Sequence, residues 1–344
     1  MLSVHFSHRA TCLSEIARYT RDMRDETVSQ GGVGGFAEPP AEMPVPNRLN
    51  LLLVMIVFVL ATGLLWLGSH VEKWWAVLGT GILFSYVLLT NYALLHEGSH
   101  GNLQTSARRN YWLGVIAGIL FPMPFTAMRS THQGHHDFNR TEREMFDLYQ
   151  PGDNRLLKYI RWYGILCGFF WPLVPLGAII FSLTPGKLRD WIFGRDQARG
   201  YLVGSIAGEA VGRVRLETFL TIVFFAAAFW LLHLRWQNTL ILYACFAFNW
   251  STRQYIGHAF SKLDVIEGAW NLRHNRFMSL VLLHGEYDLS HHRHPEISWY
   301  YLPRLSPSDK AQPNYVKQYW RQWLGPRLAT GPAANSQAVR HESA

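Results

Sequence analysis

Charged residues are scarce in this chain, at 16% of 344 residues against about 25% in soluble domains. Six stretches contain no formal charge at all: residues 49–71, 74–95, 110–128, 162–186, 218–234 and 236–252. A helix needs about 20 apolar residues to cross a bilayer, and buried helices of soluble proteins rarely reach that length repeatedly. The scarcity of charge therefore argues against a soluble enzyme and predicts a multi-pass membrane protein.

Cysteine is scarce too, with Cys12, Cys167 and Cys245 far apart and no Cys-x-x-Cys motif. This spacing indicates neither a disulfide scaffold nor a thiolate metal site. Residues 1–49 lack an apolar core preceded by basic residues, so we expect a mobile cytosolic arm there and no cleavable signal peptide. The expected organisation is this arm, a membrane domain over residues 50–303, and a basic cytosolic tail over residues 304–344.

The net charge of +8 is concentrated outside the apolar stretches, in residues 184–215 and after residue 303. An excess of Lys and Arg in loops is typical of the cytosolic side of a membrane protein. We therefore expect both basic segments to face the cytosol, and we expect no nucleic-acid partner.

Histidine, in contrast, is abundant and clustered: 11 of the 16 histidines lie in residues 96–136 and 258–294. The densest groups are the segments 96–100 (HEGSH), 132–136 (HQGHH) and 288–295 (DLSHHRHP). Spacings of three and four residues place side chains on one face of a helix, and neutral imidazole is a common ligand for transition metals. Three such clusters at the ends of apolar stretches predict a metal site at the edge of the membrane.

Two metal-dependent functions without redox chemistry are considered first. The segment His96-Glu97-x-x-His100 has the pattern of zinc proteases, in which the glutamate is the general base. A single zinc ion would leave the other clusters unexplained, so an intramembrane protease is less favoured. A metal transporter would place ionisable residues inside its spans, whereas these histidines gather at the ends.

The three histidine clusters, in this order and at these separations, resemble those of the membrane fatty acid desaturase family of di-iron enzymes. The resemblance covers residues 94–303, and the short H-x3-H first cluster looks like the acyl-lipid branch. It implies two iron ions, O2 as co-substrate, and eight metal ligands: His96, His100, His132, His135, His136, His258, His291 and His292. The last two belong to a H-H-x-x-P motif that ends at Pro295.

One position departs from the family pattern, because Asp288 stands where the third cluster usually opens with His or Gln. Asp288 is either a metal ligand or a hydrogen-bond partner that orients one of the histidines. His284 is a possible substitute ligand if its segment is helical. Glu144 and Asp147 follow the second cluster and could hydrogen-bond its imidazoles, but residues of a solvated loop are the favoured interpretation of both.

The resemblance implies an oxygen-dependent oxidoreductase, with desaturation of a lipid acyl chain as the leading prediction. Hydroxylation or ketone formation on a lipid or carotenoid, and desaturation of a small secondary metabolite, remain alternatives. No His-Pro-Gly-Gly haem motif is present, so we expect a separate electron donor of the ferredoxin, rubredoxin or cytochrome b5 type.

A shared metal site also restricts topology, since all three clusters must lie on one side of the membrane. Residues 110–128, which contain Pro122 and Pro124, must then re-enter rather than cross, and residues 162–186, broken by Pro172 and Pro175, lie along the interface. The expected fold is all-α, with four transmembrane helices in two hairpins (49–71 with 74–95, 218–234 with 236–252), re-entrant or interfacial helices, and a cytosolic histidine-rich cap. In a prokaryote this is an inner-membrane protein.

Overall fold

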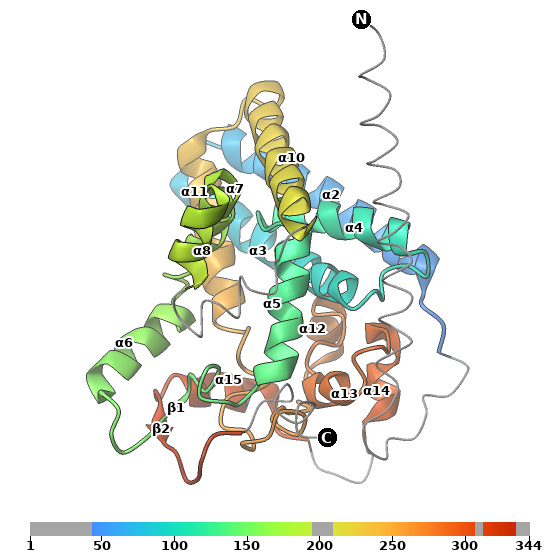
Figure 1. The fold of residues 1–344 in the computed structure, drawn as a ribbon. Helices are drawn as coiled ribbons and strands as arrows, with labels where there is room; N and C mark the ends of the chain where they lie inside the picture. The colour runs from blue at the N-terminus through green and yellow to red at the C-terminus, as the bar shows by residue number, and fades with distance from the viewer. Residues whose placement is uncertain (1–42, 195–208, 307–311, 335–344) are drawn as a thin grey trace, which may run out of the picture.

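A computed structural model describes residues 43–194, 209–306 and 312–334, and these residues are mostly helical (Figure 1). In this part of the chain the only strands are β1 (Leu148–Tyr149) and β2 (Arg327–Leu328), which pair in parallel. Most of the predicted arm over residues 1–49, and residues 195–208 of the basic loop, lie outside the described residues. The all-α expectation is confirmed at this level.

The centre of the bundle is α3 (Trp74–Ser99), which packs against α2 (Asn47–His70) and α11 (Trp236–Ser251). Glycine permits the close approach of α3 and α11, because a Cβ atom at Gly81 would lie 2.8 Å from Sγ of Cys245. The outer faces of these helices are apolar, with exposed Leu52 and Val59 on α2 and Leu83 on α3. Such faces suit a hydrocarbon environment.

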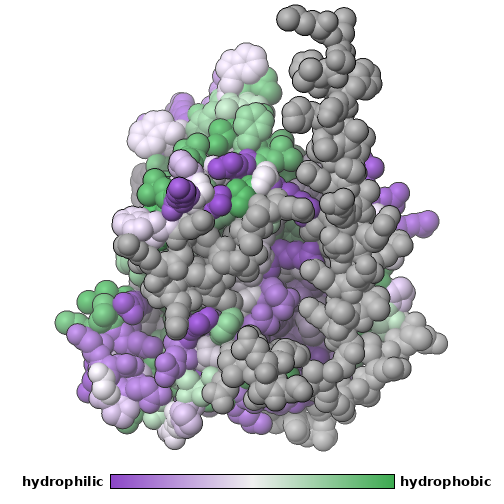
Figure 2. All heavy atoms as spheres, in the orientation of Figure 1, coloured by the Kyte–Doolittle hydropathy of each residue, from purple (hydrophilic) through white to green (hydrophobic). Residues whose placement is uncertain are grey.

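Three helices in the described part of the chain are long and apolar enough to cross a membrane: α2, α3 and residues 210–231 of α10 (Glu209–Leu231). The fourth predicted span forms α11, which has only 16 residues. The number of candidate spans rises to four if the bent helix pair over residues 107–138 forms one span. Figure 2 shows hydrophobic residues over α10, whereas hydrophilic residues gather around the β1–β2 pair. The two-hairpin layout stays a prediction.

The stretch expected to re-enter forms two helices, α4 (Ala107–Leu120) and α5 (Phe125–Phe138), joined at an angle of 95°. The bend falls at Pro122 and Pro124, where proline interrupts the helical hydrogen bonding. The Phe125 ring packs so closely on Gly114 that no Cβ fits there. The bend directs α5, which carries the second histidine cluster, away from α4.

Most of the remaining elements lie in the lower half of Figure 1, with α7 (Leu173–Leu183) and α8 (Gly186–Gly194) above them. The others are α6 (Arg155–Leu166), α12 (Arg276–Val281), α13 (Asp288–Arg293), η1 (Trp299–Tyr301), α14 (Leu302–Leu305) and α15 (Tyr315–Gln322). The indole of Trp162 in α6 donates to the Gln322 carbonyl in α15, at 3.0 Å. The helix α15 therefore packs against α6, and the division of the chain at residue 303 stays a prediction.

Candidate metal centre

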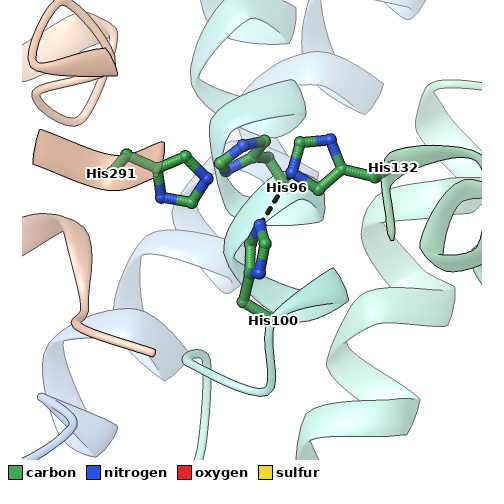
Figure 3. Close-up of side chains that lie close together, drawn as sticks. All are labelled: His96, His100, His132 and His291. Atoms are coloured by element: carbon green, nitrogen blue, oxygen red, sulfur yellow. Dashed lines mark hydrogen bonds between the residues drawn. The ribbon is translucent and has the colours of Figure 1, made fainter. Parts of the chain in front are cut away.

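Four of the predicted ligands form one group, with their candidate ligand atoms within 4.8 Å of one another: His96, His100, His132 and His291. His96 lies in the last turn of α3, and His100 caps that helix. Nε2 of His132 in α5 is 2.7 Å from Nε2 of His100. Figure 3 shows the four rings turned toward a common space, although they come from three separate helices and their ends.

A second group contains His135, His258 and His292, again within 4.8 Å. His135 is on α5, His292 on α13, and His258 follows α11 in an irregular segment. The eighth predicted ligand, His136, belongs to neither group by this distance, but its Nε2 is 3.2 Å from Nε2 of both His132 and His291. The structure thus brings all eight histidines together around two adjacent positions.

Hydrogen bonds on the far side of two imidazoles determine which nitrogen faces the centre. Nδ1 of His135 is 2.5 Å from a Glu144 carboxylate oxygen, and Nδ1 of His258 is 3.0 Å from the Gly268 carbonyl oxygen. Because both partners are acceptors, each Nδ1 carries a proton, and in the neutral ring the inward Nε2 is then the acceptor. The solvated-loop interpretation of Glu144 was wrong, since its side chain orients a predicted ligand.

The inward nitrogens of His135 and His258 then face each other at 3.1 Å, and Oδ2 of Asp288 lies 2.9 Å from the same His258 nitrogen. Three acceptor atoms in contact repel one another unless a proton or a metal cation lies among them. Nε2 of His292 also points here, buried and without a hydrogen-bond partner, 3.9 Å from Oδ1 of Asp288. This donor set fits a transition-metal ion.

The electrostatics of α13 agree with a metal-binding role. Burial, reinforced by neighbouring imidazoles, holds the pKa values of His291 and His292 well below the ordinary value, so both are neutral at pH 7. Burial alone would lower the pKa of His258, but the Asp288 carboxylate outweighs it and raises that pKa. The His258 imidazole in turn lowers the pKa of Asp288 against the effect of burial. Neutral imidazole is the form that binds metal, so the low pKa values of His291 and His292 favour metal binding by α13.

A buried ion pair fastens the His258 segment to the end of α5. The guanidinium of Arg140 donates to Asp147 at 2.6 Å and to the Tyr255 hydroxyl at 2.9 Å, and the side chains of Arg140 and Asp147 are both 0% exposed. Asp147 also accepts the backbone N–H of Phe260, at 2.5 Å. The interpretation of Asp147 as a solvated residue was therefore wrong, because its side chain is buried between Arg140 and the segment that carries His258.

The fatty acid desaturase family profile matches residues 72–324, most of the chain and beyond both ends of the resemblance seen in the sequence. The chain belongs to the fatty acid desaturase family. No curated protein matches the sequence significantly.

Within this desaturase-family site, the glutamate of the protease-like motif has another role. Glu97 is 2% exposed, and its Oε2 accepts the backbone N–H of Trp299 at 3.0 Å. Its Oε1 lies 3.8 Å from Nδ1 of His96 and does not face a water-accessible side of the centre. Glu97 therefore links α3 to the segment after α13, and nothing in its contacts resembles a protease general base.

His284 was a candidate substitute ligand only if its segment were helical, and the segment is not helical. The segment before Asp288 is a turn, with φ of 57° at His284, and α13 begins only at Asp288. Its ring stacks on Trp299, with centroids 5.8 Å apart, and it is in neither histidine group. His294, where no ligand was expected, is also in neither group.

Proposed function

We propose that this protein is an oxygen-dependent di-iron desaturase that introduces a carbon–carbon double bond into the acyl chain of a membrane lipid. Family membership supports an oxidoreductase of the desaturase type. The observation that carries the metal proposal is the convergence of imidazole nitrogens from all three histidine clusters. Removal of two hydrogens from adjacent carbons is balanced by reduction of O2 to two waters with two electrons and two protons.

Two sets of side chains would hold the iron ions. The first would be His96, His100, His132 and His291 with His136 beside them, and the second His135, His258 and His292. When bound, the pair of irons supplies the redox chemistry that activates O2. The protein's contribution is to fix the ring orientations through Glu144 and the Gly268 carbonyl, and to exclude water from the buried centre.

Asp288 fits a ligand of the second set better than an orienting partner. An orienting carboxylate would contact the nitrogen that faces away from the metal, and in His258 that nitrogen is already bonded to Gly268. Asp288 instead approaches Nε2 of both His258 and His292. Gly257 makes room for it, because a Cβ atom at that position would overlap the carboxylate. We therefore propose Asp288 as the carboxylate ligand in place of the usual histidine.

The Asp288→Ala variant is expected to bind about one iron ion per chain instead of two, because the second set loses its anionic ligand. Iron content of the purified protein, measured by plasma mass spectrometry, checks this. Asp288→His should retain both ions, and His294→Ala, a change in the same segment outside both groups, should leave iron unchanged. Full iron content in Asp288→Ala would show that the carboxylate is not a ligand.

An apolar substrate is favoured by the aromatic side chains next to the first group. Tyr92, one turn before His96, contacts the rings of Phe121 and Trp250 at centroid distances of 5.3 and 5.2 Å. These rings continue into the core of the apolar bundle. A chain of methylene groups that remains in the bilayer suits this environment better than a polar metabolite does.

An electron donor is proposed to dock near Phe260, two residues after His258. The guanidinium groups of Arg321 and Arg327 lie 5.0 and 4.3 Å from the centre of the Phe260 ring. A short stretch of backbone connects Phe260 to the predicted ligand His258. The two cations beside Phe260 favour an acidic donor protein of the ferredoxin, rubredoxin or cytochrome b5 type. We place this side in the cytosol, and in a prokaryote the membrane is the inner one.

The proposal is tested by metal content and by the lipids of cells that express the protein. We expect about two iron ions per chain and little zinc after growth in iron-replete medium. Expressing cells should gain an unsaturated acyl species that is absent from cells expressing His132→Ala. Stoichiometric zinc without iron would contradict the metal assignment, and a hydroxylated or keto product in place of an alkene would contradict the reaction.

A further inference from the structure

The helix that carries three of the predicted ligands begins without a capping residue of its own. The residue before α5 is Pro124, whose side chain makes no capping hydrogen bond, and the first turn of α5 contains no acid. The first backbone N–H groups of a helix have no acceptor within that helix, and they carry a partial positive charge. An α5 that starts beside two prolines therefore needs an acceptor from elsewhere.

Glu217 of α10 supplies that acceptor from 91 residues away. Its carboxylate accepts the Thr126 backbone N–H at 2.9 Å and the Thr126 hydroxyl at 2.7 Å. It also accepts the hydroxyl of Tyr111 in α4, at 2.8 Å. The side chain is buried, at 2% exposure, and the 17 residues that follow Glu217 in the sequence contain no charge. An ionisable group at such a depth is costly and usually serves a function.

The three contacts hold both arms of the α4–α5 bend in one position. Tyr111 belongs to α4, and its ring also packs against Phe125, the first residue of α5, with centroids 5.9 Å apart. Thr126 is the second residue of α5. The carboxylate therefore connects α4, α5 and α10 at the point where the backbone turns by 95°.

We propose that Glu217 is a positioning residue that sets the direction of α5 and thereby the geometry of its metal-binding histidines. The inference rests on the proposed metal centre. His132 and His136 lie six and ten residues after Thr126, which is about 9 to 15 Å along a helix that rises 1.5 Å per residue. A tilt of about 5° at the start of α5 would move these imidazoles by roughly 1 Å, enough to reduce turnover by about 100-fold.

The decisive variants are Glu217→Gln and Thr126→Val in the full-length protein. Glutamine keeps the shape of the side chain but offers one acceptor oxygen to three donors, and valine removes one of those donors. Thr218→Val is the matched control, because Thr218 is the next residue of α10, equally buried, and its hydroxyl contacts Ser182 of α7 instead of α5. The readout is the visible absorption of the Co2+-loaded protein, together with kcat and KM.

We expect Glu217→Gln to shift the Co2+ bands and to lower kcat by about 10- to 100-fold with KM changed by less than about threefold. Thr126→Val should shift the bands in the same direction by less, and Thr218→Val should leave them unchanged. If Glu217→Gln does not reach the membrane, Thr126→Val decides alone. Bands identical to wild type in the α5-directed variants would overturn the inference, and a wild-type protein that binds no Co2+ would overturn the metal centre itself.

Discussion

Replacing His135 with alanine is expected to abolish turnover while the protein still inserts in the membrane. His135 contributes one nitrogen to the second group and is held in place by Glu144, so its loss removes a ligand and leaves a carboxylate without its partner. Loss of an orienting partner alone typically costs 10- to 100-fold in metal affinity or activity, and loss of a ligand should cost more. Quantification of unsaturated lipid and of bound iron in the same membranes measures the effect.

The matched control for this change is His70→Ala. His70 lies at the end of α2. Among the hydrogen bonds of the described residues, its ring makes one, to the carbonyl of Trp66 one turn earlier. This variant should retain iron and turnover. Wild-type turnover in His135→Ala would remove that histidine from the proposed ligand set, whereas loss of the protein from the membrane would point to a folding role.

The Asp147→Ala variant should be among the least stable single variants, with a loss of about 3–5 kcal/mol. The change leaves the guanidinium of Arg140 buried at 0% exposure without its carboxylate, and it releases the Phe260 backbone N–H. The measurement is the thermal midpoint of the purified protein in detergent, with a decrease of about 10 °C expected. Iron bound by the second group should fall as well, since the His258 segment loses its anchor.

Two comparisons make this prediction specific to the buried ion pair. Glu267→Ala breaks the Arg293–Glu267 pair, whose side chains are 28% and 33% exposed, and such a partly exposed pair should contribute closer to the roughly 0–1 kcal/mol of surface pairs than to the value of a buried pair. Removing both buried charges in Arg140→Met with Asp147→Ala should cost less than Asp147→Ala alone, because no unpaired charge remains. A double variant less stable than the single one would contradict this account.

The sequence by itself determined the class of protein and predicted the histidines of the candidate metal site. Long stretches without charge require helices in a bilayer, because the backbone must satisfy its hydrogen bonds internally there. Histidines three and four residues apart share a helix face, so the clusters at α3 and α5 could be recognised from spacing, and the cluster of α13 from its adjacent histidines. The proline pair at residues 122 and 124 likewise predicted the break that the structure shows as a 95° bend.

Only the tertiary structure decided which acidic side chains serve the site. Glu144 orients His135, Asp147 is buried beneath the His258 segment, and Asp288 faces the ligand side of His258. Glu217 holds the start of α5 from a helix 91 residues away. A hydrogen bond between distant segments depends on how helices pack, and a lone carboxylate in a sequence carries no periodic signal that would reveal its partner. Ligand spacing is a local property of a helix, whereas orientation of those ligands comes from contacts that exist only after the chain has folded.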